Sequence, residues 1–501
     1  MRISFGSPHA RYGSVRASFV ASFLLLLMAI VVSCGGGNTS MQTSSSGMIR
    51  VSISDPPSCM PPNGSFTHVF ITVRSVQVHL SATADDSTPG WQEIAPQLAS
   101  APMQIDLFSQ AQTNCILAQL GSASLPVGSY QQIRLLLLSN SPAASAAVPA
   151  NNLCAGNGFN CVELSDNSFH QLELSSQDNT GLKIPPGQIV GGPITVAAGQ
   201  SVDLNIDFNA CASIVKEGNG AYRLKPALTA GQVSANNSGI SGQVIDAVTK
   251  APISGNVLVA IEQPDTAGVD RIMMETTADS NGNFRFCPLP TGTFDIVAVA
   301  VGPGNLPYNA TAALNIPNGT NLGAIPLQPE TGAIAPATLQ GFVTATTGTA
   351  GASTDVSVSA LQQVSFGSPA IMRQITIPLE AIMATQTASA VSSTGLVSIA
   401  ASTTCPTGTP ANTNCAQYTL VVPASNPSVG VFSASGFTYS MPAAAPVPFT
   451  VDARAALPNS GGTADCSPSE IMTTTDIDNA ALVVMPATVT TVARTDFKGC
   501  S

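Results

Sequence analysis

The sequence has little charge and few aromatic residues. Only 9% of its 501 residues are charged, 5% are aromatic, and Trp91 is the single tryptophan. A net charge of -11 argues against nucleic acid or an anionic membrane surface bound through a basic patch. The acidic residues are thinly spread, so we expect them to serve solubility rather than to recognise a cationic partner.

Familiar catalytic motifs are also missing. The sequence has no H-E-x-x-H, G-x-S-x-G or G-x-x-x-x-G-K-[ST] motif, and no C-x-x-C pair of a zinc knuckle or redox site. We expect His68, His79 and His170 at the surface, with a functional histidine pair as the alternative. Asp203 and Asp207, four strand residues apart, would be separated by about 13 Å, beyond the roughly 5–9.5 Å of glycosidase carboxylates.

The N-terminus predicts export. Arg2, Arg11 and Arg16 precede an apolar run at residues 19–32, which is shorter than the roughly 20 residues of a spanning helix. Val31-Val32-Ser33-Cys34 resembles a lipobox, in which the cysteine becomes the lipidated N-terminus. We therefore predict a signal peptide at 1–33 and a lipid anchor at Cys34, followed by a flexible tether to residue 47. The outer membrane is the expected location, and secretion after ordinary signal cleavage is the alternative.

Ten of the eleven cysteines remain if Cys34 is lipidated, and an even number in an exported chain indicates disulfides. Short spacing suggests Cys154–Cys161 and Cys405–Cys415, and Cys466–Cys500 would fasten the C-terminus. The pairing of the other four stays open: Cys59, Cys115, Cys211 and Cys287. No other cysteine lies near Cys287 in its predicted domain, so both a free thiol and a bond to another domain are possible.

Hydrophobic residues alternate with polar ones along most of the chain, which predicts an all-β protein of tandem β-sandwich domains. In residues 201–208 we expect Asp203, Asn205 and Asp207 to share a solvent face. The phase of the alternation shifts near Arg74 and Ser75, which predicts a bulge or a bend. Residues 132–138 are expected to be covered on both faces. Composition places three domains at residues 48–233, 239–328 and 335–501.

The predicted second domain resembles the carboxypeptidase regulatory-like domain. The matching segments are Gly242-Gln-Val-Ile-Asp246, Ala251-Pro-Ile-Ser-Gly255, Asp279-Ser-Asn-Gly-Asn-Phe284 and Leu289-Pro-Thr-Gly-Thr-Phe294. The resemblance implies a non-catalytic, transthyretin-like sandwich of seven strands. The family is grouped with carbohydrate-binding-like folds, which is a structural label and not evidence of sugar binding.

The predicted first domain resembles the family called domain of unknown function 4382, common in envelope lipoproteins. The matching segments are Val51-Ser-Ile-Ser-Asp-Pro-Pro57, Ile105-Asp-Leu107, Leu125-Pro-Val-Gly-Ser-Tyr130, Ile206-Asp-Phe208 and Tyr222-Arg-Leu-Lys-Pro226. The function of that family is not established, so the resemblance carries no catalytic residue over to this chain.

Two places remain candidates for ligand binding. Trp91 is either an exposed loop aromatic, as sugar-binding sites use, or a core residue at the start of a strand. Asp279, Asn281 and Asn283 could offer oxygen ligands to calcium, but the pattern fits better a β-turn in which Gly282 has positive φ. Tyr130 and Tyr222 are expected in the core.

We therefore expect a non-catalytic, lipid-anchored envelope protein without a cofactor or metal, with an interaction, adhesion or structural role. Its partners would be the membrane, through the anchor, and a surface protein or a glycan. The first alternative is a module that recognises extracellular glycan. The second is a hydrolase whose carboxylates come from neighbouring strands, which sequence cannot reveal.

Overall fold

The chain divides into Met1–Ser45 and a compact unit formed by Ser46–Ser501. The structure is a computed structural model. It describes residues 46–54, 66–109, 118–174, 181–184, 186–190, 192–208, 210–216, 221–224, 228–233, 239–253, 256–265, 267–287, 289, 292–301, 307–330, 336–347, 354–379, 397–399, 405, 407–411, 413–433, 436–440, 447–456 and 466–500. The predicted signal peptide, Cys34 and most of the tether lie outside these residues.

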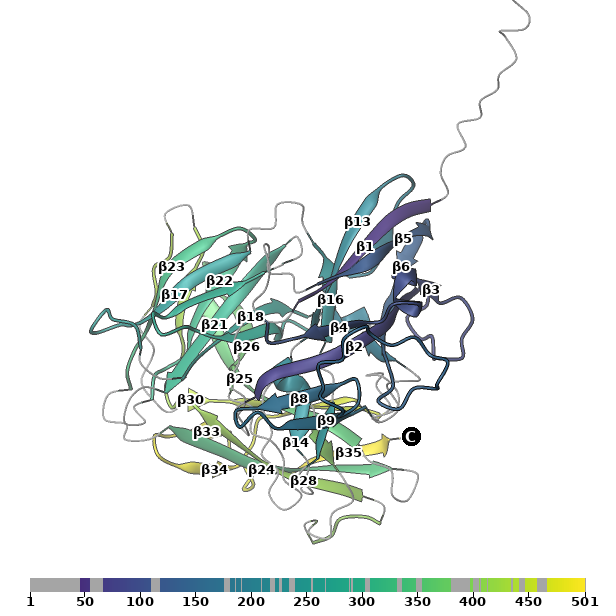
Figure 1. Cartoon of the computed structure of the whole chain (residues 1–501). Coiled ribbons are helices and arrows are strands. Elements are labelled where there is room, and N and C mark those ends of the chain that lie inside the picture. The colour runs from purple at the N-terminus through teal and green to yellow at the C-terminus, as the bar shows by residue number, and fades with distance from the viewer. Residues whose placement is uncertain are drawn as a thin grey trace, which may run out of the picture. The chain divides into compact units, whose positions relative to one another are not determined.

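Strands dominate the described chain, and only short helical turns interrupt them (Figure 1). The predicted all-β class is therefore confirmed. None of the described helices is long and apolar enough to cross a membrane. The helical turns among the described residues are η1 (Pro96–Ala99), η3 (Pro186–Gln188) and α3 (Ala210–Ser213).

The first domain contains a five-stranded sheet, a larger sheet and a small pair. The first sheet runs β11 (Ile189–Val190), β16 (Leu228–Gln232), β13 (Ser201–Phe208), β1 (Ser46–Ser54) and β5 (Ala118–Pro126). The second runs β10 (Leu182–Ile184), β7 (Gln132–Leu137), β2 (Phe66–His79), β8 (Cys161–Leu164), β9 (Phe169–Glu173), β15 (Tyr222–Leu224) and β14 (Ile214–Lys216), with β3 (Gln92–Glu93) and β4 (Met103–Asp106) beside β2. The small pair is β12 (Ile194–Val196) with β6 (Gly128–Tyr130).

Several local predictions for this domain hold. The pairing of β2 with β7 shifts register between Val73 and Ser75, so the predicted irregularity is a β-bulge. β7 is buried along nearly its whole length, as a strand covered on both faces should be. Tyr130 and Tyr222 are core residues, exposed by 1% and 2%.

The predicted solvent face of β13 is wrong for two of its three residues. Asp203 is exposed, but Asn205 and Asp207 are buried. β13 lies between β16 and β1, and serines on β1 supply partners for the buried polar groups: Ser52 Oγ donates to Asn205 Oδ1 over 3.0 Å and Ser54 Oγ donates to Asp207 Oδ1 over 3.0 Å. The alternation of apolar and polar residues correctly divided β13 into two faces. It could not show that packing buries part of both.

The second domain has seven described strands in two sheets, in agreement with the transthyretin-like expectation. One sheet runs β20 (Asn283–Phe286), β17 (Ile240–Asp246) and β23 (Asn321–Leu327). The other runs β19 (Asp270–Thr277), β18 (Asn256–Pro264), β21 (Thr293–Val301) and β22 (Thr311–Pro317). Side chains such as Val244, Phe286, Ile261 and Ile296 fill the space between the sheets.

The predicted third domain also forms two main sheets. The first contains β28 (Thr413–Val422), β24 (Ala337–Thr347), β34 (Val489–Thr491) and β35 (Thr495–Cys500). The second contains β26 (Ile371–Thr376), β25 (Thr354–Phe366), β31 (Thr450–Ala456), β32 (Glu470–Thr473) and β27 (Val397–Ile399), and β30 (Val447–Pro448) pairs with β33 (Val483–Val484).

The second and third domains share structure across the predicted boundary. β29 (Ser428–Val431), from the third domain, pairs in parallel with β22 and extends the larger sheet of the second domain. Val297, Val299 and Leu314 face the third-domain core, whereas Ile296 and Ile316 face the core of their own domain. The larger sheet of the second domain is therefore apolar on both faces.

The structure contains the disulfides Cys154–Cys161, Cys405–Cys415 and Cys466–Cys500, the three pairs that the sequence suggested. Cys287 is also disulfide-bonded, which excludes a free thiol there. Its bond leaves the second domain, because residues 239–328 contain no other cysteine. Cys59, Cys115 and the side chain of Cys211 lie outside the described residues.

Candidate functional site

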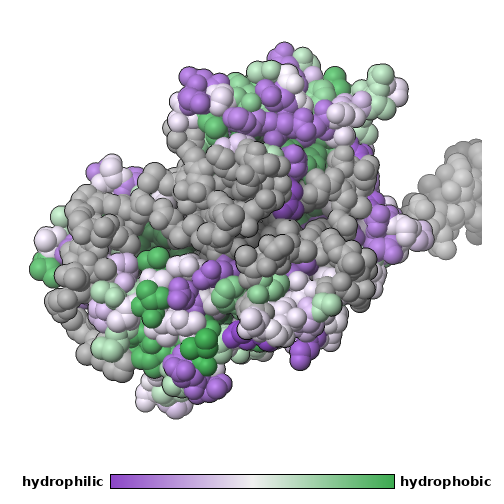
Figure 2. All heavy atoms as spheres, turned by 90° about the horizontal axis from the view of Figure 1, so that it is seen from below, coloured by the Kyte–Doolittle hydropathy of each residue, from purple (hydrophilic) through white to green (hydrophobic). Residues whose placement is uncertain are grey.

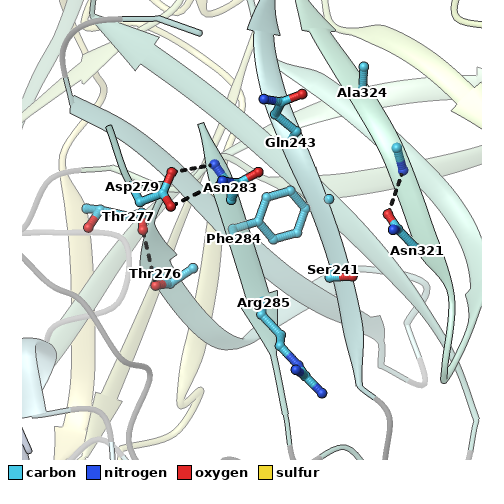
Figure 3. Close-up of a pocket in the computed structure, with 12 residues that line it drawn as sticks. Ser241, Gln243, Thr276, Thr277, Asp279, Asn283, Phe284, Arg285, Asn321 and Ala324 are labelled. Carbon is cyan, nitrogen blue, oxygen red and sulfur yellow. Dashed lines mark hydrogen bonds between the residues drawn. The ribbon is translucent and has the colours of Figure 1, made fainter. Parts of the chain in front are cut away.

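A groove of about 710 Å³ crosses the three-stranded sheet of the second domain (Figure 3). Its floor is formed by β20, β17 and β23, and the end of β19 forms one wall through Thr276 and Thr277. β17 lies in the middle of this sheet, so its side chains on this face lie between those of both neighbours.

Strand register gives the groove two rows of side chains. Ser241 pairs with Arg285 on one side and with Asn321 on the other, so these three lie side by side on one face. Gln243 pairs in the same way with Asn283 and Ala324. The surface is therefore built mainly from amide and hydroxyl groups, with the exposed guanidinium of Arg285 at one end (Figure 3).

Phe284 lies beneath this polar surface. Its side chain is 5% exposed, and a Cβ on Gly242 would approach the ring to 2.8 Å. Because Gly242 has no side chain, the Phe284 ring can lie directly against the central strand β17. A larger residue at position 242 would push the ring away from the strand. The ring supports the floor of the groove and offers little surface for stacking.

The turn that begins at Asp279 closes one end of the groove. Its Oδ1 accepts the backbone N–H group of Asn283 over 2.8 Å, and its Oδ2 accepts the Asn283 side-chain amide over 3.2 Å (Figure 3). Oδ1 also accepts the backbone N–H group of Asn281 over 2.8 Å. The hydrogen bonds from Asn283 and Asn281 lower the pKa of Asp279. Gly282 has φ of +77°, as the β-turn interpretation required.

These contacts use the Asp279 carboxylate within the turn, as the β-turn interpretation expects. Among the described residues, no three His, Cys, Asp or Glu side chains form a group that could hold a metal ion. Of the residues that line the groove, Asp279 supplies the carboxylate and Arg285 the positive charge.

Trp91 lies in the first domain, and its ring is already engaged. Its Nε1–H donates to the carbonyl oxygen of Asp85 over 2.9 Å. The Arg134 guanidinium lies 4.2 Å from the ring centroid, a cation–π contact, and the His79 ring lies 5.1 Å away. Trp91 is therefore a local packing residue and not an open platform for a sugar ring.

The prediction of a surface position is wrong for His79. Its side chain is 7% exposed, and its Nδ1 accepts the Ser81 backbone N–H over 2.9 Å. Nε2 must then carry the proton that it donates to the Pro89 carbonyl over 3.2 Å. His68 is paired with Asp106 at 2.6 Å and its side chain is 45% exposed. His170 is partly exposed and lies beside Tyr222.

Sequence reasoning missed a group of buried carboxyls. Glu262, Asp270, Asp295 and Asp452 are each exposed by 1% or less. Two of them are polar interruptions of apolar strands, as in Val259-Ala-Ile-Glu262 and Phe294-Asp-Ile-Val297, and such interruptions were the available signal. They converge where the second and third domains meet and not in an open cleft, so they do not support the hydrolase alternative.

Exposed apolar side chains are scattered. The most exposed large ones in the third domain include Ile477, Met485 and Val489. On the face drawn in Figure 2, hydrophobic groups of the described chain stand between hydrophilic ones. Such a distribution is usual on protein surfaces and does not identify a surface for a binding partner.

Comparison with known proteins supports the sequence resemblances. Residues 46–226 match the family model of a domain of unknown function, DUF4382. Residues 239–321 match the model of the carboxypeptidase regulatory-like domain. No curated protein matches the chain.

Solved structures give distant likenesses. The Bacillus anthracis TIE protein is 9% identical with a TM-score of 0.15, over 91% of this chain and 50% of that one, so the chain spans about half its length. The shaft pilin SpaA from Lactobacillus rhamnosus GG is 12% identical with a TM-score of 0.17, over 57% and 98% of the two chains. A streptococcal ancillary pilin is 10% identical with a TM-score of 0.15, over 79% and 94%.

Scores this low carry no inference about function. The family models are the informative comparison, and they cover the first two domains. Residues 46–226 thus carry the DUF4382 assignment, and residues 239–321 carry the carboxypeptidase regulatory-like assignment.

Proposed function

We propose that the chain is an envelope-anchored structural protein, tethered through Cys34, in which the second and third domains act as one stiff body. Its disulfides are those of a surface or extracellular protein, because such bonds persist outside the reducing cytosol. The observation that carries the structural role is the insertion of β29 beside β22.

This strand insertion supports a mechanical coupling. Backbone N–H groups of Ser428 and Phe432 donate to the carbonyls of Ala310 and Leu314, both over 2.9 Å. After β29 the chain turns back, so that Ser440 N–H donates to the Val429 carbonyl over 2.8 Å. Phe437 and Tyr439 then pack against the second-domain core. Separating the two domains would break backbone ladder bonds as well as side-chain contacts.

The anchor is tested by comparing the full chain with a Cys34→Ala variant in its native export host. We expect the mature wild-type protein to carry a diacylglycerol mass at Cys34 and to sediment with membranes, and the variant to be released. A Ser40→Ala variant, altered in the tether, is the control and should remain membrane-bound. If wild type and Cys34→Ala are equally soluble and share one cleaved N-terminus, the anchor is disproved and the protein is secreted.

A second candidate function is recognition of extracellular glycan in the polar groove. The rows of amide and hydroxyl side chains on β20, β17 and β23 favour it, since such groups can bind sugar hydroxyls without an aromatic platform. The test is a glycan array probed with the full chain and with a Gln243→Ala/Asn321→Ala variant.

For a glycan bound in the groove, the double variant should bind about tenfold more weakly, since each neutral hydrogen bond contributes about 1 kcal/mol or less. Trp91→Ala is the matched control and should bind as the wild type does, because that ring is covered by Arg134. Absence of any specific glycan, or binding that survives the double variant, would rule the groove out.

A further inference from the structure

The carboxyl groups between the second and third domains are too numerous for the positive charges that face them. Glu262 on β18 and Asp295 on β21 are directly opposite in the strand register. Side chains in such positions start about 4.5–5.5 Å apart, and like charges there repel. Both residues are buried, at 0% and 1% exposure, so water cannot screen the repulsion.

Asp270 adds a third carboxyl at this place. It is 0% exposed, and neither of its oxygens has a hydrogen-bond partner among the residues that the structure describes. Within the same residues, Oε1 of Glu262 is also buried without a hydrogen-bond partner. Arg373, on β26 of the third domain, forms an ion pair with Asp295, and its Nε lies 3.8 Å from Asp270 Oδ1. One guanidinium therefore serves both Asp270 and Asp295, which lie beside Glu262.

Neutral groups complete the contact. The backbone N–H of Thr376, at the end of β26, donates to Glu262 Oε2 over 3.1 Å. Its Oγ1 donates to the carbonyl oxygen of Asp270 over 2.6 Å. β26 is therefore the element of the third domain that lies against the carboxyl groups of β18, β19 and β21.

A second guanidinium lies farther along the same interface. Arg271 bonds Asp265 over 2.9 Å and also bonds Asp452 on β31 and Glu470 on β32. Arg454, half-exposed, lies 3.9 Å from Glu470. The charged groups around the contact are the acids Glu262, Asp265, Asp270, Glu275, Asp295, Asp452 and Glu470 and the bases Arg271, Arg373 and Arg454.

Burial and mutual repulsion favour the protonated acids. Burial, with the neighbouring Asp295 charge, raises the pKa of Asp270 to about 9. Burial and the Asp270 charge raise the pKa of Glu262 well above its ordinary value. Burial raises the pKa of Asp452 to about 6, although Arg271 opposes the shift.

We propose that the contact between β26 and the second domain is a proton-held latch, closed while Glu262 and Asp270 carry protons and loosened when they ionise. The inference concerns only the contact between these two domains and does not depend on the anchor or on the groove. Because the β29 insertion is separate from this contact, ionisation would free the β26 side while β29 stays paired.

The raised pKa values determine whether docking becomes stronger or weaker as pH rises. A carboxyl that binds its proton more tightly when docked stabilises the docked state fully at pH below its ordinary pKa. That stability is lost as pH rises toward the pKa of the carboxyl in the docked state, which is about 9 for Asp270 and about 6 for Asp452. Asp265 has a lowered pKa, so its contribution changes only at more acidic pH.

The latch is tested by hydrogen exchange in the full chain at a series of pH values. The readout is the opening constant of the Ile371–Thr376 amides, corrected for intrinsic exchange, with β7 as the internal reference. In the wild type, opening should increase with pH up to about 9, approaching tenfold per pH unit for each proton released. A Glu262→Gln/Asp270→Asn variant should show no such increase between about pH 6 and about pH 9, because Asp452, which it keeps, titrates at about 6. Asp203→Asn, altered at an exposed site, should behave as wild type.

Infrared spectroscopy provides a test that does not require the double variant to fold. The wild type should retain a protonated-carboxyl band at neutral pH, and the single Asp270→Asn variant should weaken it. Absence of that band from the wild type, or an unchanged pH dependence of β26 exchange in a folded double variant, would overturn the proposal.

Discussion

Replacing Asp207 with asparagine is expected to stabilise the first domain above neutral pH and to flatten its stability between about pH 4 and pH 7. Asp207 is 3% exposed on β13, and its Oδ1 accepts a hydrogen bond from Ser54. Burial raises its pKa from 3.8 to about 7, and the Ser54 hydrogen bond only partly opposes this.

The direction and size of this stability change follow from the coupling between proton binding and folding. The folded state holds the proton more tightly than the unfolded chain, so stability is greatest below pH 3.8 and falls until pH reaches about 7. The shift corresponds to roughly 4 kcal/mol at most. Asparagine keeps the oxygen that accepts from Ser54 but cannot ionise, so it should recover much of that free energy at pH 8.

The measurement is denaturant unfolding of both proteins across this pH range, followed by a first-domain signal such as Trp91 fluorescence. Asp203→Asn is the matched control, since Asp203 lies on the same strand but is exposed beside Arg50. That control should retain the wild-type pH dependence. An Asp207→Asn protein with an undiminished pH slope would show that another group is responsible.

Replacing Gly430 with proline is expected to detach β29 from β22 and to destabilise the joined second and third domains by roughly 3 kcal/mol. In a parallel ladder every second residue donates to the neighbouring strand, and Gly430 lies between the donors Ser428 and Phe432. Proline removes that donor. Any Cβ at this position would also lie 2.7 Å from the Tyr439 ring.

Thermal unfolding and limited proteolysis measure this effect. We expect a lower unfolding midpoint and new cleavage between β28 and β30, whereas Val431→Thr, which keeps its backbone N–H, should resist both. If Gly430→Pro is as stable and as resistant as the wild type, the strand insertion does not couple the domains and the proposed stiff body loses its main support.

Local patterns predicted the local structure of this chain well. The apolar alternation identified strands, the phase shift near Arg74 and Ser75 marked a bulge, and the Asp279 segment was a turn. Close spacing was sufficient for Cys154–Cys161 and Cys405–Cys415, because a loop of a few residues restricts the available partners. Cys466–Cys500 was predicted because it fastens the C-terminal strand. Each of these features depends on residues that are near one another in the sequence.

The features that the sequence did not predict depend on tertiary packing. Asp207 lies on a face that alternation alone would assign to solvent, and packing buries it. Asp295 interrupts the apolar strand β21 and is buried beside Arg373 of β26. His79 is buried because the loop that carries Pro89 and Trp91 folds over it. The groove depends on the register of three strands that are distant in sequence, and one sequence does not reveal such a register.

The insertion of β29 also bears on how the chain folds. Thr311 pairs with Ser428, so the edge of β22 is completed by a segment 117 residues later (428 minus 311). Until that segment arrives, the second domain presents an unpaired strand edge, which invites association with other chains. Contacts of such long sequence separation also slow folding. We therefore expect a chain truncated before Ser428 to aggregate during refolding, and the complete chain to pass through a slow final step in which β29 docks.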